Sequence, residues 1–124
     1  MSEHIVTIDG EVNYPITLDP TVWIFDRRKF PIQAVFPQIE EEGQCMHLNP
    51  FLHNAEPLRG ATQVVCVLKT GERVPLTLDQ ANAAILRFSR NKKAILEDGP
   101  IWLYLADGSN VDNPIRNIQR FEVE

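Results

Sequence analysis

Residues 62–80, TQVVCVLKTGERVPLTLDQ, decide the fold. TQVVCVLK is a continuous apolar run of strand length that is rich in valine, which indicates a central strand covered on both faces. Thr70-Gly71 predicts a turn into a second strand, ERVPLTL, whose Pro75 cannot donate to a ladder and therefore favours an exposed edge. Asp79 then has a side chain suited to cap a helix. The stretch predicts two neighbouring strands followed by a helix.

The segment after Asp79, QANAAILRFSR, has helical periodicity. Its apolar residues form one stripe at helical spacing: Ala81, Ala84, Ile85 and Phe88. Asn91 and the lysines after it fit a helix end, because cations are favourable near the C-terminal end of the helix dipole. We therefore predict one main helix at about 79–90.

A similar pattern occurs earlier in the chain. GEVNYPITLDP, residues 10–20, matches GERVPLTLDQ, residues 71–80, with a one-residue gap, and DGSNVDNPIRNI at 107–118 is a looser copy. Asp9-Gly10 lies between two β-rich runs and predicts a hairpin, in which Pro15 again favours an edge strand. The unequal spacings exclude a solenoid. Recurrent turn chemistry and a two-lobed pseudo-repeat are the two interpretations that remain.

The whole pattern predicts an α+β domain with a mostly antiparallel sheet. After a Gly99-Pro100 turn, IWLYL reads as a strand, Asp107-Gly108 as a turn, and the last segment as a strand ending near Val123. A length of 124 residues fits a single domain over 1–124. Residues 37–60 have no sustained period, and we expect an irregular connection there, with at most a helical turn near PFLHN.

Composition excludes several classes of protein. The chain has 12 Lys+Arg and 17 Asp+Glu, a net charge of −5, so binding to a nucleic-acid backbone is disfavoured. No apolar run reaches the length of a membrane-spanning helix, about 20 residues. The opening MSEHIVTIDGEV has no signal-peptide pattern, and two cysteines do not make a disulfide framework. We expect a cytoplasmic protein with no nucleic-acid or membrane partner.

The C-terminal half, ATQVVCVLKTGERVPLTLDQ followed by ANAAILRFSRNKKAILEDGPIWLYLADGSNVDNPIRNIQRFEV, resembles the molybdopterin-binding domain of the sulfite oxidase family. That family has an apolar strand, a Gly turn, a strand ending in Leu and an acidic residue, a helix, and a Gly-Pro before another apolar strand. VTIDGEVNYPITLDP resembles its opening strand pair. The resemblance covers residues 5–18 and 61–123 and implies a reduced form of this fold.

Three phrases also resemble a family of small uncharacterised proteins from Bacillus and related bacteria: TLDPTVWIFDRRKF, NAEP and DGPIWLYLADGSNVDNPIRNIQRF. Some members of that family have a loose peptidyl-prolyl isomerase label. Nothing in this sequence resembles an aromatic-lined isomerase pocket, so the resemblance implies a bacterial origin and no isomerase activity.

The middle of the chain departs from the sulfite oxidase pattern. That family binds its metal through a Cys in a long middle region that also cradles the pterin phosphate. Here the middle is about two dozen residues, and Cys45 is followed by MHLNP in place of a Cys-Gly-Asn-Arg-like stretch. Because a fold does not carry a function across such a deletion, we expect a domain without a cofactor.

The irregular connection holds one candidate metal site. Cys45, His47 and His53 form C-x-H-x5-H, and these side chains can bind Zn²⁺ and order a loop, so a metal-ordered module is one hypothesis. The spacing matches no standard zinc site, and a polar surface loop is the alternative. A Cys45 nucleophile with a histidine base is also conceivable, although no local signature supports it.

Two further sets of residues are candidate ligand-binding groups. Arg27 and Arg28 in DRRK could hold an anion with their planar guanidinium forks, or form a solvated turn that faces the Glu40-Glu41-Glu42 run. Trp102 and Tyr104 alternate with an apolar face, as Trp23 and Phe25 alternate in the earlier run, and would form an exposed aromatic patch if no helix covers them.

The sequence predicts a non-catalytic binding or interaction domain with an unknown protein or small-molecule partner, and a homodimer is one form it could take. The alternatives are a vestigial oxidoreductase domain that binds a pterin or another anionic ligand through Arg27, Arg28 and Cys45, and the metal-ordered module.

Overall fold

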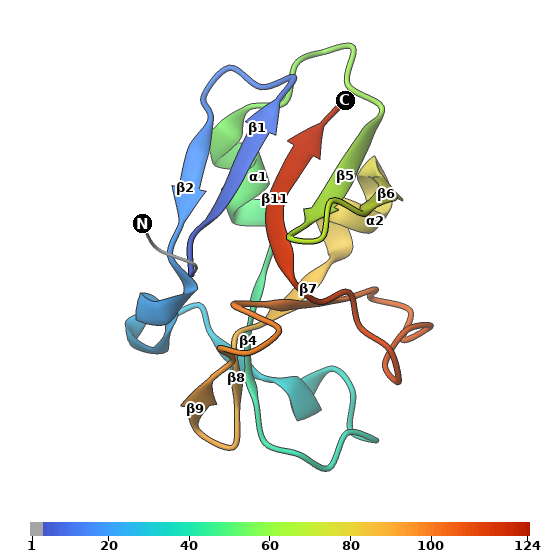
Figure 1. Cartoon of the computed structure of the whole chain (residues 1–124). Coiled ribbons are helices and arrows are strands. Elements are labelled where there is room, and N and C mark those ends of the chain that lie inside the picture. Colours follow the sequence, from blue (N-terminus) through green and yellow to red (C-terminus); the bar gives the residue numbers. More distant parts are fainter. Residues whose placement is uncertain (1–3) are drawn as a thin grey trace.

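A computed structural model describes residues 4–124 of the chain. Its upper part in Figure 1 is a five-stranded sheet in the order β2-β1-β11-β5-β6. The strands are β1 (Val6–Gly10), β2 (Ile16–Leu18), β5 (Gln63–Leu68), β6 (Arg73–Thr77) and β11 (Ile118–Val123). β1 and β11 are parallel, and the other neighbours are antiparallel. The C-terminal strand therefore lies in the middle of the sheet, between the first strand and β5.

The lower part contains a four-stranded antiparallel sheet in the order β10-β7-β4-β3, and a separate β8–β9 hairpin. Their bounds are β3 (Phe30–Pro31), β4 (Gln44–His47), β7 (Ile85–Arg87), β8 (Ser89–Arg90), β9 (Lys93–Ala94) and β10 (Trp102–Tyr104). Two 3₁₀ helices, η1 (Pro20–Phe25) and η2 (Ile32–Ala34), flank β3 in the sequence.

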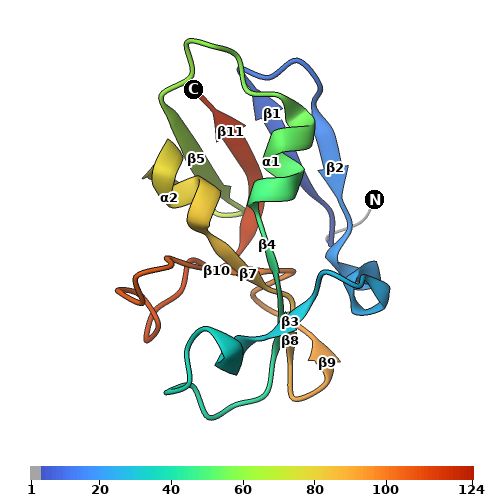
Figure 2. The same ribbon diagram turned by 180° about the vertical axis from the view of Figure 1, so that it is seen from behind.

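Two short helices cover one face of the five-stranded sheet. Figure 2 shows α1 (Asn49–Ala55) and α2 (Leu78–Ala83) on the same side of the strands. The main core lies between them and includes Ile8, Leu52, Cys66, Ala81 and Phe121. A second, smaller core under the four-stranded sheet contains Ile32, Phe36, Cys45, Ile85, Ile95, Trp102 and Tyr104.

Charged side chains run across the opposite face of the five-stranded sheet. Arg120 pairs with Asp9 at 2.8 Å, and Arg73 pairs with Glu122 at 2.7 Å. Between them Val67 is buried although no helix lies over it, because long side chains on the neighbouring strands cover it with their aliphatic stems. The central strand predicted from residues 62–69 is confirmed, and its second face is covered by an ionic layer.

The α+β class with mostly antiparallel pairing is confirmed. Both prolines mark edges as predicted, since Pro75 lies in the edge strand β6 and Pro15 directly precedes the edge strand β2. The predicted hairpin at Asp9-Gly10 exists, but residues 11–15 connect its strands.

The main helix predicted at about 79–90 is wrong in its second half. α2 ends at Ala83, Ala84 is extended with ψ of 146°, and the chain continues as β7 and β8. The apolar stripe at helical spacing belongs to a strand because β7 finds partners on both sides, β4 and β10, and this pairing overrides local propensity. Asn91 and Lys92, with φ of 50° and 66°, form the β8–β9 turn and do not end a helix.

The N-cap also differs from the prediction. Thr77, two residues before Asp79, accepts a hydrogen bond from the Gln80 backbone N–H at 3.0 Å, and the Gln80 side chain accepts one from the Thr77 N–H at 2.9 Å. This reciprocal pair is a capping box. The segment 37–60, expected to be irregular, contains β4 and α1, so the helical turn near PFLHN is part of a complete helix.

Within residues 4–124, no helix has the length and apolar character needed to cross a membrane.

We predict that Thr77→Ala lowers the free energy of unfolding by about 1 kcal/mol, because it removes the side-chain acceptor of the capping box. Urea denaturation measures the change. Thr62→Ala is the matched control, since Thr62 is exposed and its side chain makes no hydrogen bond with residues 4–124. Equal stability of the two variants would contradict a role of the capping box.

Candidate functional site

The 3₁₀ helix η1 is built from an apolar sequence, PTVWIF, and begins at a capped end. Asp19 Oδ1 accepts the Thr21 N–H at 3.1 Å. Because a 3₁₀ helix has three residues per turn, Pro20 and Trp23 share one face, and both are buried. Trp23 stacks on Phe51 of α1 with ring centroids 5.1 Å apart and meets Phe88 edge-on at 5.7 Å. Trp23 therefore fixes η1 both to α1 in the upper part of the molecule and to the segment after β7 in the lower part.

The outer faces of η1 leave large apolar side chains in solvent. Phe25 is 85% exposed, Val22 53% and Ile24 46%. Leu96, 57% exposed, follows β9 and lines a shallow depression together with Pro20 and Thr21. We call Val22, Ile24, Phe25 and Leu96 the η1 surface. Grouped apolar exposure of this kind marks an interaction site more often than scattered single residues do.

Basic side chains surround the η1 surface. Arg27 and Lys29 lie two and four residues after Phe25, and Lys93 lines the same pocket as Leu96. Glu97, next to Leu96, is the exposed carboxylate that opposes them. The carboxylates at the two ends of η1 already have partners, because Asp19 caps the helix and Asp26 binds Arg28.

Arg28 belongs to the support of this surface. Its guanidinium binds both oxygens of Asp26, at 3.0 and 2.8 Å, and lies 5.0 Å from the centroid of the Phe51 ring. These hydrogen bonds hold the pKa of Asp26 at about 2. Of the two arginines predicted to bind a ligand, Arg27 is exposed without an ion-pair partner among the described residues, whereas Arg28 is committed to Asp26.

A buried arginine organises the lower part of the molecule. Arg87 on β7 is only 2% exposed. Its guanidinium donates to the Ser89 carbonyl at 3.1 Å, the Tyr104 hydroxyl at 3.2 Å and the Glu42 carbonyl at 3.0 Å. Gly43 passes so close to this guanidinium that a Cβ there would collide with it. Arg87 thus ties the loop before β4 to β7, β8 and β10.

Glu41 completes this network from the surface. It contacts Arg87 at 3.2 Å and forms a two-oxygen pair with Arg90, at 2.6 and 2.7 Å. The hydrogen bonds from Arg90, assisted by the charges of Arg90 and Arg87, lower the pKa of Glu41. The acidic run at 40–42 therefore faces β7 and β8, and not the Arg27-Arg28 turn that the sequence suggested.

Trp102 lies among three guanidinium groups. Arg116, Arg90 and Arg87 lie 4.5, 4.9 and 5.6 Å from its ring centroid. The indole N–H donates to Asp98 at 3.0 Å, and Asp98 also contacts Arg116 at 3.4 Å. Cation–π contacts and a satisfied N–H explain how a tryptophan is held at the edge of the sheet.

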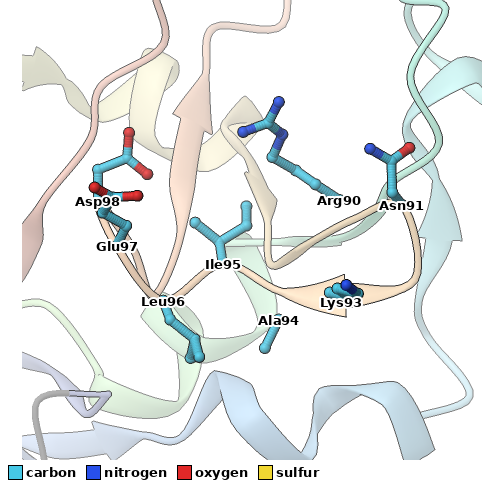
Figure 3. Close-up of a pocket in the computed structure, with 8 residues that line it drawn as sticks. All are labelled: Arg90, Asn91, Lys93, Ala94, Ile95, Leu96, Glu97 and Asp98. Atoms are coloured by element: carbon cyan, nitrogen blue, oxygen red, sulfur yellow. The ribbon is translucent and has the colours of Figure 1, made fainter.

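An open pocket of about 490 Å³ lies along the β8–β9 hairpin and the segment after it. Figure 3 shows Glu97 and Asp98 at one end of this pocket and Arg90 and Asn91 at the other. Side chains of both charges line this pocket, and Arg90 is already paired with Glu41. The pocket therefore favours neither an anionic nor a cationic ligand.

Trp102 and Tyr104 do not form an exposed aromatic patch. They are 6% and 1% exposed, packed in the smaller core, and burial raises the pKa of Tyr104. The segment after Ile32, with Phe36 against Tyr104 at 5.7 Å, covers the face that the sequence left open. Exposure falls instead on Phe25, which sequence reasoning paired with Trp23 as alternating strand residues. The Asp19-Pro20 pair before this run is typical of a helix start, and it could have shown that Trp23 and Phe25 lie in a helix and not in a strand.

The structure does not gather Cys45, His47 and His53 into one site. No group of three His, Cys, Asp or Glu side chains within residues 4–124 is placed to hold a metal ion. Cys45 is fully buried on β4, His47 stacks on Phe30 at 4.6 Å, and His53 is exposed on α1. Burial raises the pKa of Cys45 to about 12, the opposite of what a nucleophile or a thiolate ligand needs.

Comparisons with known proteins inform the fold alone. No family model and no curated protein matches the sequence. Among solved structures, the chain is similar to the sulfane dehydrogenase SoxCD from Paracoccus pantotrophus, with a TM-score of 0.69 and 10% sequence identity. The match covers 99% of this chain and 39% of that chain, so this protein spans about two fifths of its length. The likeness shows that this chain shares its fold with part of that chain.

The residues present do not fit a molybdopterin centre of the sulfite oxidase type. Such a centre needs a thiolate at an open site, and both cysteines of this chain are buried in sheets. Burial raises the pKa of Cys66, like that of Cys45, to about 12. The predicted use of Cys45 with Arg27 and Arg28 does not fit either, because Cys45 is fully buried, Arg27 is exposed and Arg28 is paired with Asp26.

We predict that Arg87→Met lowers the free energy of unfolding by about 2–4 kcal/mol, because three backbone carbonyls and the Tyr104 hydroxyl lose their shared donor. Urea denaturation provides the measurement. Arg27→Met, at an exposed arginine without an ion pair, is expected to change stability by less than about 0.5 kcal/mol. A similarly small change for Arg87→Met would show that the buried hydrogen-bond network makes no net contribution to the free energy of unfolding.

We predict that neither cysteine reacts with Ellman's reagent in the folded protein at pH 8, since both thiols are buried and protonated. In guanidinium chloride both are expected to react at once. Fast reaction of one thiol in the native protein would contradict the placement of Cys45 or Cys66, and the variants Cys45→Ala and Cys66→Ala identify which.

Proposed function

We propose that this chain is a protein-interaction domain, without a catalytic or cofactor-binding role, that binds an acidic segment of a partner protein on the η1 surface. The observation that carries the proposal is the 85% exposure of Phe25 on a helix whose inner face is fixed by Trp23. The exposed Phe25 ring is unfavourably hydrated, and a partner that covered the ring would remove this free-energy cost.

The apolar part of the η1 surface is large enough to contribute binding energy. Fully burying a Phe, Leu, Ile or Val side chain contributes about 1.5–3 kcal/mol. Burying most of Val22, Ile24, Phe25 and Leu96 would therefore supply several kcal/mol before the cost of association. That cost is reduced on this side, because Trp23 and Asp19 already hold the backbone of η1 in place.

Charge selects the kind of partner. The chain has a net charge of −5, yet Arg27, Lys29 and Lys93 lie near the η1 surface. Of the nearby carboxylates, Asp19 and Asp26 have partners at the ends of η1, and Glu97 faces solvent. An acidic segment with apolar side chains would complement both features, and the attraction would raise its association rate at low salt. A symmetric homodimer through the same surface would bring two basic rims together, which disfavours a second copy as the occupant.

The proposal is tested with a fluorescein-labelled synthetic peptide in which Asp and Glu alternate with Phe and Leu. We expect fluorescence anisotropy to detect binding that weakens with added salt, and NMR to place the shifted amides at residues 20–29 and 92–97. Phe25→Asp is expected to weaken binding by about tenfold or more, because it puts a carboxylate at the centre of the surface.

The controls address both parts of the proposal. Tyr14→Asp changes an aromatic residue that is 59% exposed at the opposite end of β2, and should leave the affinity unchanged. A peptide with Lys in place of every acid should not bind. Equal binding of the Lys peptide, or shifts outside the η1 surface, would contradict the proposal, as would a stable dimer in light scattering that Phe25→Asp dissociates.

A further inference from the structure

A second pocket, distinct from the η1 surface, lies between the two helices. α1 and α2 are neighbours on one face of the sheet (Figure 2). A pocket of about 310 Å³ is lined by residues of both helices and of the segment 57–61. Its floor is apolar: Leu52, Leu58 and Leu78. Its polar lining comes from Asn49, His53, Arg59 and Asn82.

The polar lining has no carboxylate. Although the chain has more acidic than basic residues, no Asp or Glu is among the residues that line this pocket. The nearest acids in the sequence are Glu56, which accepts a hydrogen bond from Asn13 at 3.1 Å, and Asp79, which lines a different pocket. Arg59 therefore sets a positive potential beside the apolar residues of the lining.

The polar side chains of this pocket are not used by the fold. The side chains of Asn49, His53, Arg59 and Asn82 have no hydrogen bond or ion pair with other residues in the described part of the chain. Arg87, Arg90 and Arg120, in contrast, are committed to ion pairs, and among the described arginines only Arg27 is unpaired like Arg59. A set of unpaired donors around one concave site is the arrangement that ligand pockets have.

The wall that carries Arg59 is held in place. Glu56 has a left-handed conformation with φ of 54° and donates its N–H to the His53 carbonyl at 3.1 Å, which ends α1. Leu58 donates to the Glu11 carbonyl at 2.9 Å, and Ala61 to the Leu58 carbonyl at 3.0 Å. Pro57 forms a bridge with Val12. The loop is therefore fixed to the β1–β2 connection, and the pocket exists without a ligand.

We propose that this pocket binds a carboxylate on a short apolar stem. The Arg59 guanidinium offers a planar fork that matches a carboxylate, and the Asn49 and Asn82 amides can donate beside it. The leucine floor accepts the stem. A volume of 310 Å³ corresponds to roughly ten water molecules at their share of liquid volume, which limits the ligand to a compact group.

Two sources of this chemistry are possible: a free aliphatic monocarboxylate, or the C-terminal carboxylate of a peptide that ends in an aliphatic residue. Both place one charge at Arg59 and one alkyl group on Leu52 and Leu78. This pocket is separate from the η1 surface, because Trp23 of η1 packs on Phe51 of α1 whereas the pocket is lined by Leu52 and His53. Ligand binding to the pocket can therefore be tested independently of the proposed function.

The first experiment titrates the full chain with sodium hexanoate and, separately, with 1-hexanol, and follows backbone amides by NMR. We expect hexanoate to bind at about millimolar affinity and to shift residues 49–61 and 78–82, while hexanol binds at least about tenfold more weakly. Acetyl-glycyl-leucine and its amide form the peptide arm. If the free acid binds more tightly than hexanoate and the amide does not bind, the source is a peptide C-terminus.

Arg59→Gln is the decisive variant, because Arg59 is exposed and its loss should not disturb folding. We expect it to reduce hexanoate affinity by about tenfold, whereas Lys69→Gln, which removes an exposed cation in the β5–β6 turn, should leave it unchanged. Equal weakening by both variants would show a general charge effect and overturn the proposal. Equal binding of hexanoate and hexanol, or shifts elsewhere, would also overturn it.

Discussion

The hydrogen bonds of one buried guanidinium hold the lower half of this protein together. Arg87 is on the central pair of the four-stranded sheet, and its donors reach backbone carbonyls of the loop before β4 and of β8 as well as the Tyr104 hydroxyl. A buried charge is tolerated only if its donors are satisfied. The path of the loop at 41–43, the close approach of Gly43 and the pairing of Glu41 with Arg90 all follow from this constraint.

A single tryptophan connects this lower half to the helices. Trp23 stacks on Phe51 of α1 and meets Phe88 just beyond β7, so η1 is held between the two parts of the molecule. The same anchor explains the exposed apolar surface, because a 3₁₀ helix that turns one face inward directs the other two outward. Stability and the candidate interaction surface therefore have a common origin in the sequence PTVWIF.

The likeness to a much longer sulfane dehydrogenase chain and the properties of the cysteines bear on different questions. The likeness concerns how the sheets and helices are arranged. The chemistry depends on individual side chains, and here Cys45 and Cys66 are buried thiols of raised pKa within the two cores. The likeness in fold therefore does not by itself carry a function to this chain.

Local chemistry determined a large part of the architecture. The valine-rich run at 62–69, the glycine turns and the two prolines were sufficient to predict a central strand, the strand that follows it and the two edge strands, because these signals act within a few residues. Only the tertiary structure decided the conformation after Ala83 and the exposure of each aromatic residue. Ile85–Arg87 is a strand because partners from distant segments were available on both sides. Trp102 is buried and Phe25 exposed for the same kind of reason: burial depends on which distant segment covers a side chain, and no local pattern contains that information.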